Sequence, residues 1–210
     1  MRRSKADAEI TRCAILDAAA DLFAKQGISR TKLDDIAASA GVTRGAIYWH
    51  FADKASLIAA MIDRVSAPTE AAMAALNNMN ATDTLALDTL KKVVVDAFTR
   101  TYHTPAAAQI TRFILRYSLS DETEAVNARI EHNRQLSFAH INTFIEHAQK
   151  AGLVTTELPS ACIANHIRAH IIGLFHHHLS TPPPGISPDD VAASMDLVLK
   201  GLSPPRSRAN

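Results

Sequence analysis

Residues 9–63 contain no proline, and the glycines among them are few: Gly27, Gly41 and Gly45. Ala, Leu, Ile and Met dominate this stretch, and strict alternation of apolar and polar residues is scarce, so helices are favoured over strands. The apolar spacing and the glycine stops predict helices over 9–26, 33–40 and 44–51, and another from 54 onward. The stretch therefore has to fold as short helices joined by tight turns.

Pro68 marks a change in the sequence, because prolines interrupt the chain more often after it. It predicts an end or a kink in the fourth helix. Beyond it, apolar spacing predicts helices over 69–80, 84–102, 105–118, 122–151, 159–179 and 188–202. The sequence thus predicts an all-α fold of about nine helices. An N-terminal three-helix domain is expected over residues 1–67 and a second helical domain over residues 68–210.

Polar residues are predicted to cap the early helices. Thr31 and Asp34 have the spacing of a capping box that would open the helix at residue 33. Thr43 is a good N-cap for the helix over 44–51, and Asp53 for the helix that begins at 54.

The composition excludes several classes of protein. Apolar residues make up 47% of the 210 residues and charged residues 20%, which supplies a core and rules out general disorder. Cys13 and Cys162 lie too far apart for a metal or redox motif, and such cysteine usage favours the cytoplasm. No apolar run reaches the length of a membrane span, and no signal peptide is recognisable. We expect no catalytic residues, no enzyme activity and no cofactor, because no triad, metal cluster or phosphate loop is recognisable.

Two short helices joined by a tight glycine turn form a helix-turn-helix. The apolar residues that can hold the two helices together are Ile36, Ala37, Ala40, Val42 and Ile47. The outer face of the second helix carries Arg44, Tyr48 and His50, while Gly45 keeps the backbone open to a ligand. Arg44 lies in the first turn, where recognition helices meet base edges, and arginine can bind guanine O6 and N7 with two hydrogen bonds.

The stretch from Gly27 to Lys54, with Gly-Val-Thr-Arg-Gly-Ala-Ile-Tyr-Trp-His-Phe over 41–51, resembles the TetR family of bacterial transcriptional regulators. Residues 43–51 look most like the subgroup that represses multidrug efflux-pump operons. The resemblance implies an all-α homodimer. Its N-terminal helix-turn-helix domain would bind operator double-stranded DNA, and its C-terminal domain would dimerise and hold a small-molecule inducer.

The resemblance also implies which residues contact DNA. Thr31 and Lys32 would meet a phosphate at a helix N-terminus, and Tyr48 and Lys54 match positions that commonly contact phosphate. Trp49 is either a contact or a packing residue. With Phe51 left out as a packing residue, the implied DNA-binding set is Thr31, Lys32, Thr43, Arg44, Gly45, Tyr48, Trp49, His50 and Lys54.

Apolar residues follow helical spacing along several predicted helices of the C-terminal half. Converging apolar faces build either a packed core or a cavity, and each of these residues can serve in either. The resemblance implies that some line an inducer pocket, which would suit an amphipathic or aromatic molecule. Arg168 is the polar candidate. The candidate ligand-binding residues are Phe98, Ile110, Phe113, Ile114, Tyr117, Ile141, Ile145, Ile167, Arg168 and Ile171.

The chain contains ten histidines, and His166, His170 and His177 lie along one helical face. A pair spaced four residues apart can bind zinc or nickel, but the third lies too far along the same helix for one ion. The alternative is a dimer face, since the last two helices build the interface in the family that the chain resembles. Histidines there would make dimerisation sensitive to pH. We predict no metal site.

The last predicted helix carries an apolar stripe that is expected to face the partner protomer: Val191, Ala192, Met195, Val198, Leu199 and Leu202.

The sequence departs from efflux regulators at Tyr117-Ser118-Leu119-Ser120, where members often carry Lys-Cys-Glu-Phe, so ligand preference cannot be copied from a relative. A net charge of +1 does not argue against DNA binding, because the placement of basic residues matters more than their sum.

The expected function is a ligand-responsive repressor that binds a palindromic operator as a dimer. A small apolar or amphipathic inducer would release it, and it would control a multidrug efflux-pump operon. The alternative is a metal- or metabolite-responsive regulator of the same family that controls other genes.

Overall fold

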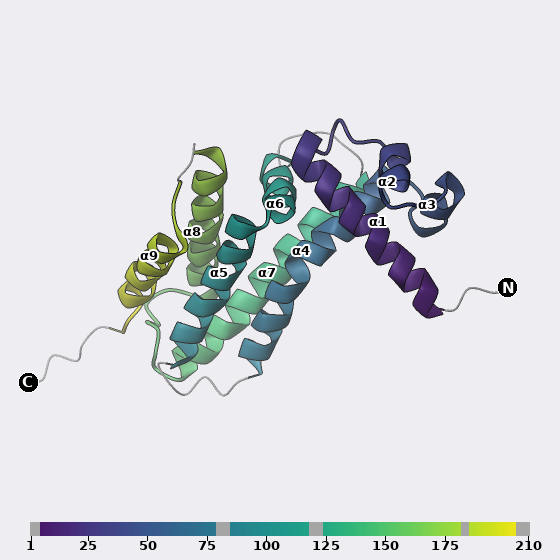
Figure 1. Ribbon diagram of the computed structural model, residues 1–210. Coiled ribbons are helices and arrows are strands. Elements are labelled where there is room, and N and C mark those ends of the chain that lie inside the picture. The colour runs from purple at the N-terminus through teal and green to yellow at the C-terminus, as the bar shows by residue number, and fades with distance from the viewer. Residues whose placement is uncertain (1–4, 79–84, 118–123, 182–184, 205–210) are drawn as a thin grey trace, which may run out of the picture. The chain divides into compact units, whose positions relative to one another are not determined.

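The computed structural model describes residues 5–78, 85–117, 124–181 and 185–204. Helices make up these residues almost entirely, and none of them forms a strand (Figure 1). The helices of the described ranges are α1 Lys5–Gln26, α2 Leu33–Ser39, α3 Arg44–His50, α4 Lys54–Asn77, α5 Leu85–His103, α6 Pro105–Tyr117, α7 Glu124–Lys150, α8 Ser160–Ser180 and α9 Pro188–Gly201. The predicted all-α fold is confirmed, and most helix ends lie close to the predicted ones.

Of the two predictions for Pro68, the helix end is wrong, because α4 continues through this residue to Asn77, and the kink stays a prediction. A proline inside a helix removes one backbone hydrogen bond and costs about 3 kcal/mol. Pro68 itself is exposed, and buried apolar side chains lie on both sides of it along the helix: Met61 and Ile62 before it, Met73 and Leu76 after it. Each buried side chain of this size contributes about 1.5–3 kcal/mol, so burial outweighs the lost bond.

The chain forms two compact units. The first comprises residues 1–65 and 104–131, and the second comprises residues 66–103 and 132–210. The first unit therefore includes α6 and the start of α7, which lie beyond the predicted domain boundary at residue 67. The predicted boundary separates a DNA-binding domain from an inducer-binding and dimerisation domain, and this assignment of functions stays a prediction.

The core of the first unit joins the three early helices to α4, α6 and α7. Ile15 and Phe23 of α1 are fully buried, and α1 packs on both α2 and α6. The other fully buried side chains of this core are Ala19, Ile36, Ile47, Leu57, Ile62, Ile110 and Val126. The short helices α2 and α3 are thus held by tertiary packing, because helices of two turns are marginal by themselves.

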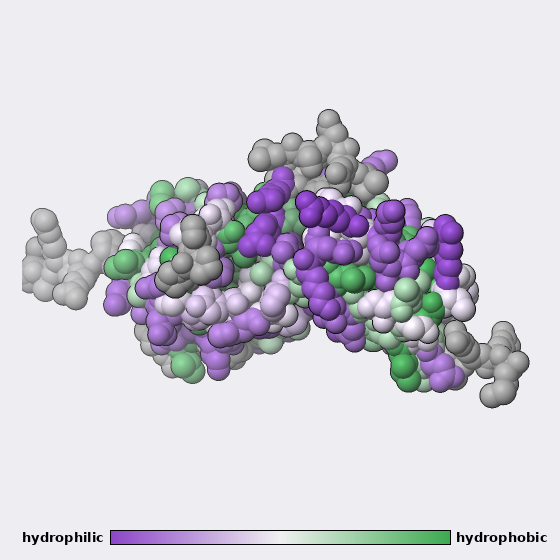
Figure 2. Space-filling view, turned by 45° about the horizontal axis from the view of Figure 1, so that its top comes forward, coloured by the Kyte–Doolittle hydropathy of each residue, from purple (hydrophilic) through white to green (hydrophobic). Residues whose placement is uncertain are grey.

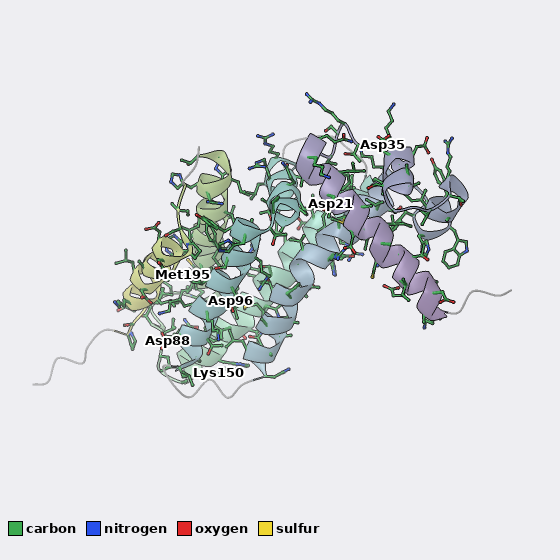
Figure 3. All side chains as sticks on the ribbon, in the orientation of Figure 1. Asp21, Asp35, Asp88, Asp96, Lys150 and Met195 are labelled. Carbon is green, nitrogen blue, oxygen red and sulfur yellow. The ribbon has the colours of Figure 1, made fainter. Side chains whose placement is uncertain are left out.

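The core of the second unit is formed mainly by α5, α7, α8 and α9. Val191 and Met195 of α9 are fully buried, and Leu199 and Leu202 nearly so (Met195 is labelled in Figure 3). Because α9 packs on α5 of the same chain, these four buried residues of the predicted stripe do not face a partner protomer. Ala192 and Val198 are half-buried, and the prediction that α9 lies at a dimer interface stays a prediction. An apolar stripe indicates that a helix face is buried but not which element buries it.

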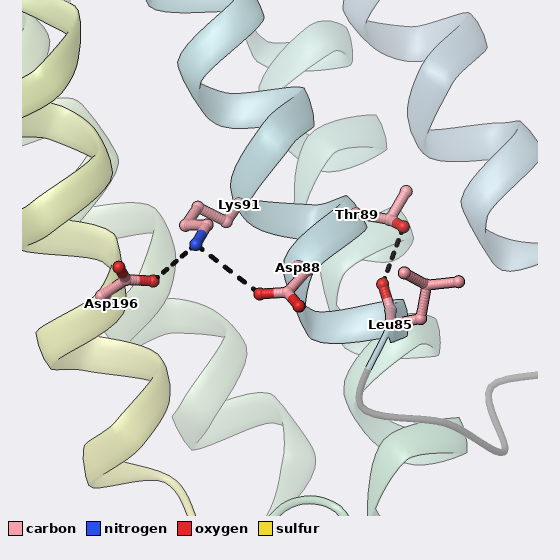
Figure 4. A network of polar contacts seen from close by, with 5 residues as sticks. All are labelled: Leu85, Asp88, Thr89, Lys91 and Asp196. Atoms are coloured by element: carbon pink, nitrogen blue, oxygen red, sulfur yellow. Dashed lines mark hydrogen bonds and ion pairs between the residues drawn. The ribbon is translucent and has the colours of Figure 1, made fainter.

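One ionic contact accompanies the packing of α9 on α5. Lys91 Nζ of α5 lies 2.8 Å from Asp196 Oδ1 of α9 and 3.6 Å from Asp88 Oδ1 (Figure 4). The hydrogen bond with Lys91 lowers the pKa of Asp196 below its ordinary value. The contact therefore joins α5 and α9 by one ion pair beside their apolar packing.

The surface in the space-filling view is mostly hydrophilic, with small apolar areas between the polar side chains (Figure 2). In the described part of the chain, no helix is long and apolar enough to cross a membrane.

Candidate nucleic-acid interface

The turn between α2 and α3 depends on Gly41, which has a φ of 67°. L-residues with a side chain rarely adopt this left-handed conformation, whereas glycine does so at little cost. The amide of Gly41 donates to the carbonyl of Ala38, and that of Val42 donates to the carbonyl of Ala37, which closes α2. Ile36, Ala37 and Ile47 are buried between the helices, and Ala40 and Val42 pack at the edge of the same core, as predicted. The helix-turn-helix is present.

The N-terminus of α2 differs from the prediction. Lys32 is the N-cap residue, and its amide donates to Asp35 Oδ2 at 3.1 Å (Asp35 is labelled in Figure 3). Thr31 is only 1% exposed, and its hydroxyl donates to the carbonyl of Gly27 at 2.8 Å. The predicted box of Thr31 with Asp34 is therefore wrong by one residue. Thr31 closes the turn before α2, and its buried side chain is not exposed to a DNA phosphate.

The two ends of α3 are fixed as predicted. Thr43 caps the helix, because its hydroxyl accepts a hydrogen bond from the amide of Ala46 at 3.2 Å. Asp53 caps α4 in the same way, accepting from the amide of Ser56 at 2.7 Å. Phe51 is buried under the guanidinium of Arg12, with 5.5 Å from Cζ to the ring centroid. These contacts hold α3 at both ends within the first unit.

The face of α3 that points away from the core carries Arg44, Tyr48 and Trp49. Trp49 is 73% exposed, which disfavours the packing role that the sequence left open. An exposed tryptophan that does not serve the core is available to a partner. His50 is half-buried, and its ring lies edge-on to that of Trp49 with the centroids 4.6 Å apart.

Arg44 makes a defined set of contacts on this face. Its Nε lies 3.2 Å from Asp34 Oδ1 of α2, and its Cζ lies 5.7 Å from the centroid of the Tyr48 ring. A hydrogen bond with Tyr48 and the negative charge of Asp34 raise the pKa of Arg44 above its ordinary value. The guanidinium is thus charged and held between two neighbours.

The predicted phosphate-binding residues lie around the same helices. Lys54 begins α4, and its Nζ donates to the carbonyl of Ser29 at 3.4 Å. Lys32 is exposed at the start of α2, and Gly45 and Thr43 are exposed at the start of α3. All the predicted DNA-binding residues therefore lie in the first unit, and Thr31 is the buried one among them.

The predicted ligand-binding residues do not share one core. Ile110 is buried and Phe113 and Ile114 are partly buried in the core of the first unit. Phe98, Ile141, Ile145 and Ile167 are buried in the core of the second unit, against which Ile171 is partly buried. Tyr117 ends α6, but its side chain lies outside the described residues, as do Ser118, Leu119 and Ser120. The assignment of these residues to an inducer site stays a prediction.

Arg168 and the histidines of α8 have neighbours in the second unit. Arg168 Cζ lies 5.8 Å from the centroid of the Phe138 ring. His170 Nε2 lies 3.0 Å from Ser194 Oγ of α9, and burial followed by the charge of His166 lowers the pKa of His170. His177 lies near Thr181 at the end of α8. Among the described residues, no group of three His, Cys, Asp or Glu side chains could hold a metal ion.

The sequence of the helix-turn-helix matches that of a known protein family. Residues 15–61 match the model of the bacterial regulatory proteins of the tetR family. Over 178 residues, which are 85% of this chain and 79% of the relative, the sequence is 32% identical to the HTH-type transcriptional regulator SrpR of Pseudomonas putida. The chain belongs to the TetR family of bacterial transcriptional regulators.

Solved structures agree with this assignment along the length of the chain. NalD, the secondary repressor of the MexAB-OprM multidrug efflux pump in Pseudomonas aeruginosa, is 29% identical. The similarity covers 97% of this chain and 100% of NalD, with a TM-score of 0.75. SmeT of Stenotrophomonas maltophilia, in a complex with triclosan, gives a TM-score of 0.80 over 91% of each chain. SmeT is 24% identical, so this likeness shows the fold alone.

The sequence did not indicate two of the residues that shape these sites. Asp34 faces Arg44, whereas Asp35, one residue later, accepts the hydrogen bond at the start of α2. Phe138 of α7 lies under the guanidinium of Arg168. Both partners come from neighbouring helices, and the crossing of two helices decides which side chains meet. Spacing along one helix carries no signal for such pairs.

Proposed function

We propose that this TetR-family chain is a ligand-responsive transcriptional repressor that binds a palindromic operator as a homodimer. A small apolar or amphipathic inducer releases it, and the operon that it controls encodes a multidrug efflux pump. The observation that carries the proposal is the exposed face of α3, with Arg44, Tyr48 and Trp49 on a helix fixed at both ends. The similarity to NalD over nearly the whole chain supports the efflux assignment.

The first unit supplies two kinds of contact in this proposal. Arg44 reads base edges in the major groove, because it lies in the first turn of α3 and carries a forked set of donors. Lys32, Tyr48, His50 and Lys54 contact phosphates, and the exposed residues Thr43, Gly45 and Trp49 add further contacts with the DNA. Phosphate contacts fix the position of the protein on the duplex, whereas the arginine supplies sequence preference.

The inducer acts by shifting a conformational equilibrium. It binds more tightly to a conformation in which the two recognition helices of the dimer no longer match the spacing of the half-sites, so the affinity for DNA falls. A coupling of about 1–3 kcal/mol is typical and is reciprocal, so operator DNA must weaken inducer binding by the same factor. The predicted pocket residues, Arg168 among them, are the proposed site of this ligand.

The test is a binding titration of the full chain on duplexes that cover the region upstream of its own gene. Binding to one palindrome at least about a thousandfold tighter than to a scrambled duplex is expected. Triclosan and other amphipathic antibacterial compounds are then added to the complex as probes. Release of the protein by one of them supports the inducer role, whereas equal affinity for all duplexes contradicts the proposed function.

A further inference from the structure

Asp34 is an acidic side chain beside the helix that is proposed to contact DNA. It lies in the first turn of α2, is 56% exposed, and approaches Arg44 Nε to 3.2 Å through Oδ1. A carboxylate near a phosphate backbone weakens binding to any DNA, because like charges repel. Its presence at this place therefore calls for a reason other than affinity.

The contact does little for folding. The side chain of Arg44 is 71% exposed, and an ion pair between two exposed groups contributes little to stability because water and salt screen it. Asp34 is not the residue that accepts the hydrogen bond of the N-cap amide of α2 either, since Asp35 does so. Both Asp34 and Asp35 lie in the first turn of α2, where a negative charge interacts favourably with the helix dipole. The contact with Arg44 is what distinguishes Asp34 from Asp35.

The direction of the Arg44 guanidinium decides which of its N–H donors can reach a DNA base. Arginine has five N–H donors in one plane, and the donor on Nε is the one that faces Asp34. The two terminal nitrogens, which carry the other four donors, lie on the part of the plane away from Nε. Tyr48, whose ring centroid is 5.7 Å from Cζ, borders the group on a second side. A guanine read by two hydrogen bonds needs a planar pair of donors in a fixed position.

We propose that Asp34 is a positioning residue that holds Arg44 in the orientation required to read a guanine. Its negative charge lowers the affinity for any DNA, whereas the fixed orientation of Arg44 raises the discrimination between sequences. This inference rests on the proposed function, since it requires that α3 meets DNA bases. A flexible arginine loses side-chain freedom when it binds, whereas an arginine that is already oriented loses less. An unpaired arginine would also attach to any phosphate within reach, and the carboxylate of Asp34 reduces that attraction.

The experiment compares the full chain with Asp34→Asn, Arg44→Ala and the double variant. Each protein is titrated on the palindrome selected from a random duplex pool by the wild-type chain, on the same duplex with each G·C pair changed in turn, and on a scrambled duplex. The control is Asp35→Asn, which removes the same charge one residue away and keeps an oxygen that can cap α2. Thermal unfolding verifies that each variant is folded.

We expect Asp34→Asn to bind the scrambled duplex as tightly as the wild type or more tightly. Its discrimination at the base pair read by Arg44 should fall by about threefold to tenfold. Asp35→Asn should keep that discrimination. In the Arg44→Ala background, adding Asp34→Asn should leave the remaining discrimination unchanged, because the residue through which Asp34 acts is gone.

Full discrimination in Asp34→Asn overturns the inference and leaves the proposed function intact. An equal loss of discrimination with and without Arg44 also overturns it, because Asp34 would then act through the fold of α2. If the wild-type chain selects no sequence from the pool, the proposed function fails and the inference fails with it.

Discussion

Phe51 and Trp49 are two residues apart, and the fold assigns them opposite environments. Phe51 is 3% exposed and packs in the core of the first unit under Arg12, whereas Trp49 is 73% exposed on α3. Their similar size and aromatic character conceal this difference in the sequence. Phe51 is therefore expected to contribute to the stability of the helix-turn-helix, and Trp49 to its binding of DNA.

Replacing these two residues should therefore affect different properties. Phe51→Ala should lower the free energy of unfolding by about 3–5 kcal/mol, because a buried aromatic side chain leaves a cavity. Trp49→Ala should change it by less than about 0.5 kcal/mol and should weaken operator binding. Urea denaturation and DNA titration of both variants measure the two effects. A stable Phe51→Ala chain, or a Trp49→Ala chain with unchanged DNA affinity, contradicts the assignment.

Removing a proposed phosphate contact should weaken binding to every duplex alike. Lys54→Ala should lower the affinity for specific and scrambled DNA by the same factor, because a phosphate carries no sequence information. The slope of log affinity against log salt should become shallower by about 0.9, the value for one neutralised phosphate. Titrations at several salt concentrations give the slope. Lys92→Ala, an exposed lysine of α5 in the second unit, serves as the control and should leave the slope unchanged.

His170 should make the stability of the second unit depend on pH. Burial lowers the pKa of His170 below its ordinary value of about 6.5. The unfolded chain then binds the proton more tightly than the folded chain, so stability is full above about pH 6.5 and is lost as the pH falls through the lower folded pKa. Denaturant midpoints at about pH 7.5 and about pH 5.5 measure the loss.

His170→Gln should shrink the difference between these two midpoints, whereas replacing the exposed His132 of α7 by Gln should leave it as in the wild type. Equal pH dependence in the wild type and in His170→Gln would show that other groups carry the effect. The hydrogen bond of His170 with Ser194 of α9 makes this test sensitive to the packing of α9 on α8.

The ion pair between α5 and α9 should matter more than the one within α5. Asp196 lies 2.8 Å from Lys91 Nζ and belongs to another helix, whereas Asp88 lies 3.6 Å away on the same helix. Asp196→Asn should therefore lower the midpoint of thermal unfolding more than Asp88→Asn does. Because Lys91 lowers the pKa of Asp196, this difference should vanish as the pH falls through the folded pKa of Asp196, below its ordinary value of 3.8. A larger effect of Asp88→Asn would contradict the role of the pair.

The local features of the fold could be predicted because they depend on neighbouring residues. Gly41 had to adopt a positive φ, and the hydroxyl of Thr43 had to cap α3, whatever the rest of the chain did. The continuation of α4 through Pro68 could not be predicted, since it depends on burial before and after the proline. For the same reason, the apolar stripe of α9 did not reveal that α5 covers it.

Some features of the candidate site could likewise be predicted from neighbouring residues, whereas others depend on tertiary contacts. The outward direction of Arg44 and Tyr48 follows from the helical period and was predicted. The role of Trp49 was left open between contact and packing, and His50, predicted on the same outer face, is half-buried. The burial of Thr31 and the approach of Asp34 to Arg44 depend on a shift of one residue in the start of α2 and on the crossing of α2 and α3. Propensities describe helix ends only to within a residue or two, which is too coarse to assign either side chain.

Binding of a dimer to a symmetric operator is tested most directly by a hydroxyl-radical footprint of the full chain on the DNA upstream of its own gene. Two symmetric protected patches, centred roughly 34–36 Å or one helical turn apart, are predicted for a dimer that places one α3 in each half-site. Arg44→Ala should weaken both patches together. A single asymmetric patch, or uniform protection without sequence preference, would contradict the binding of a dimer with one α3 in each half-site.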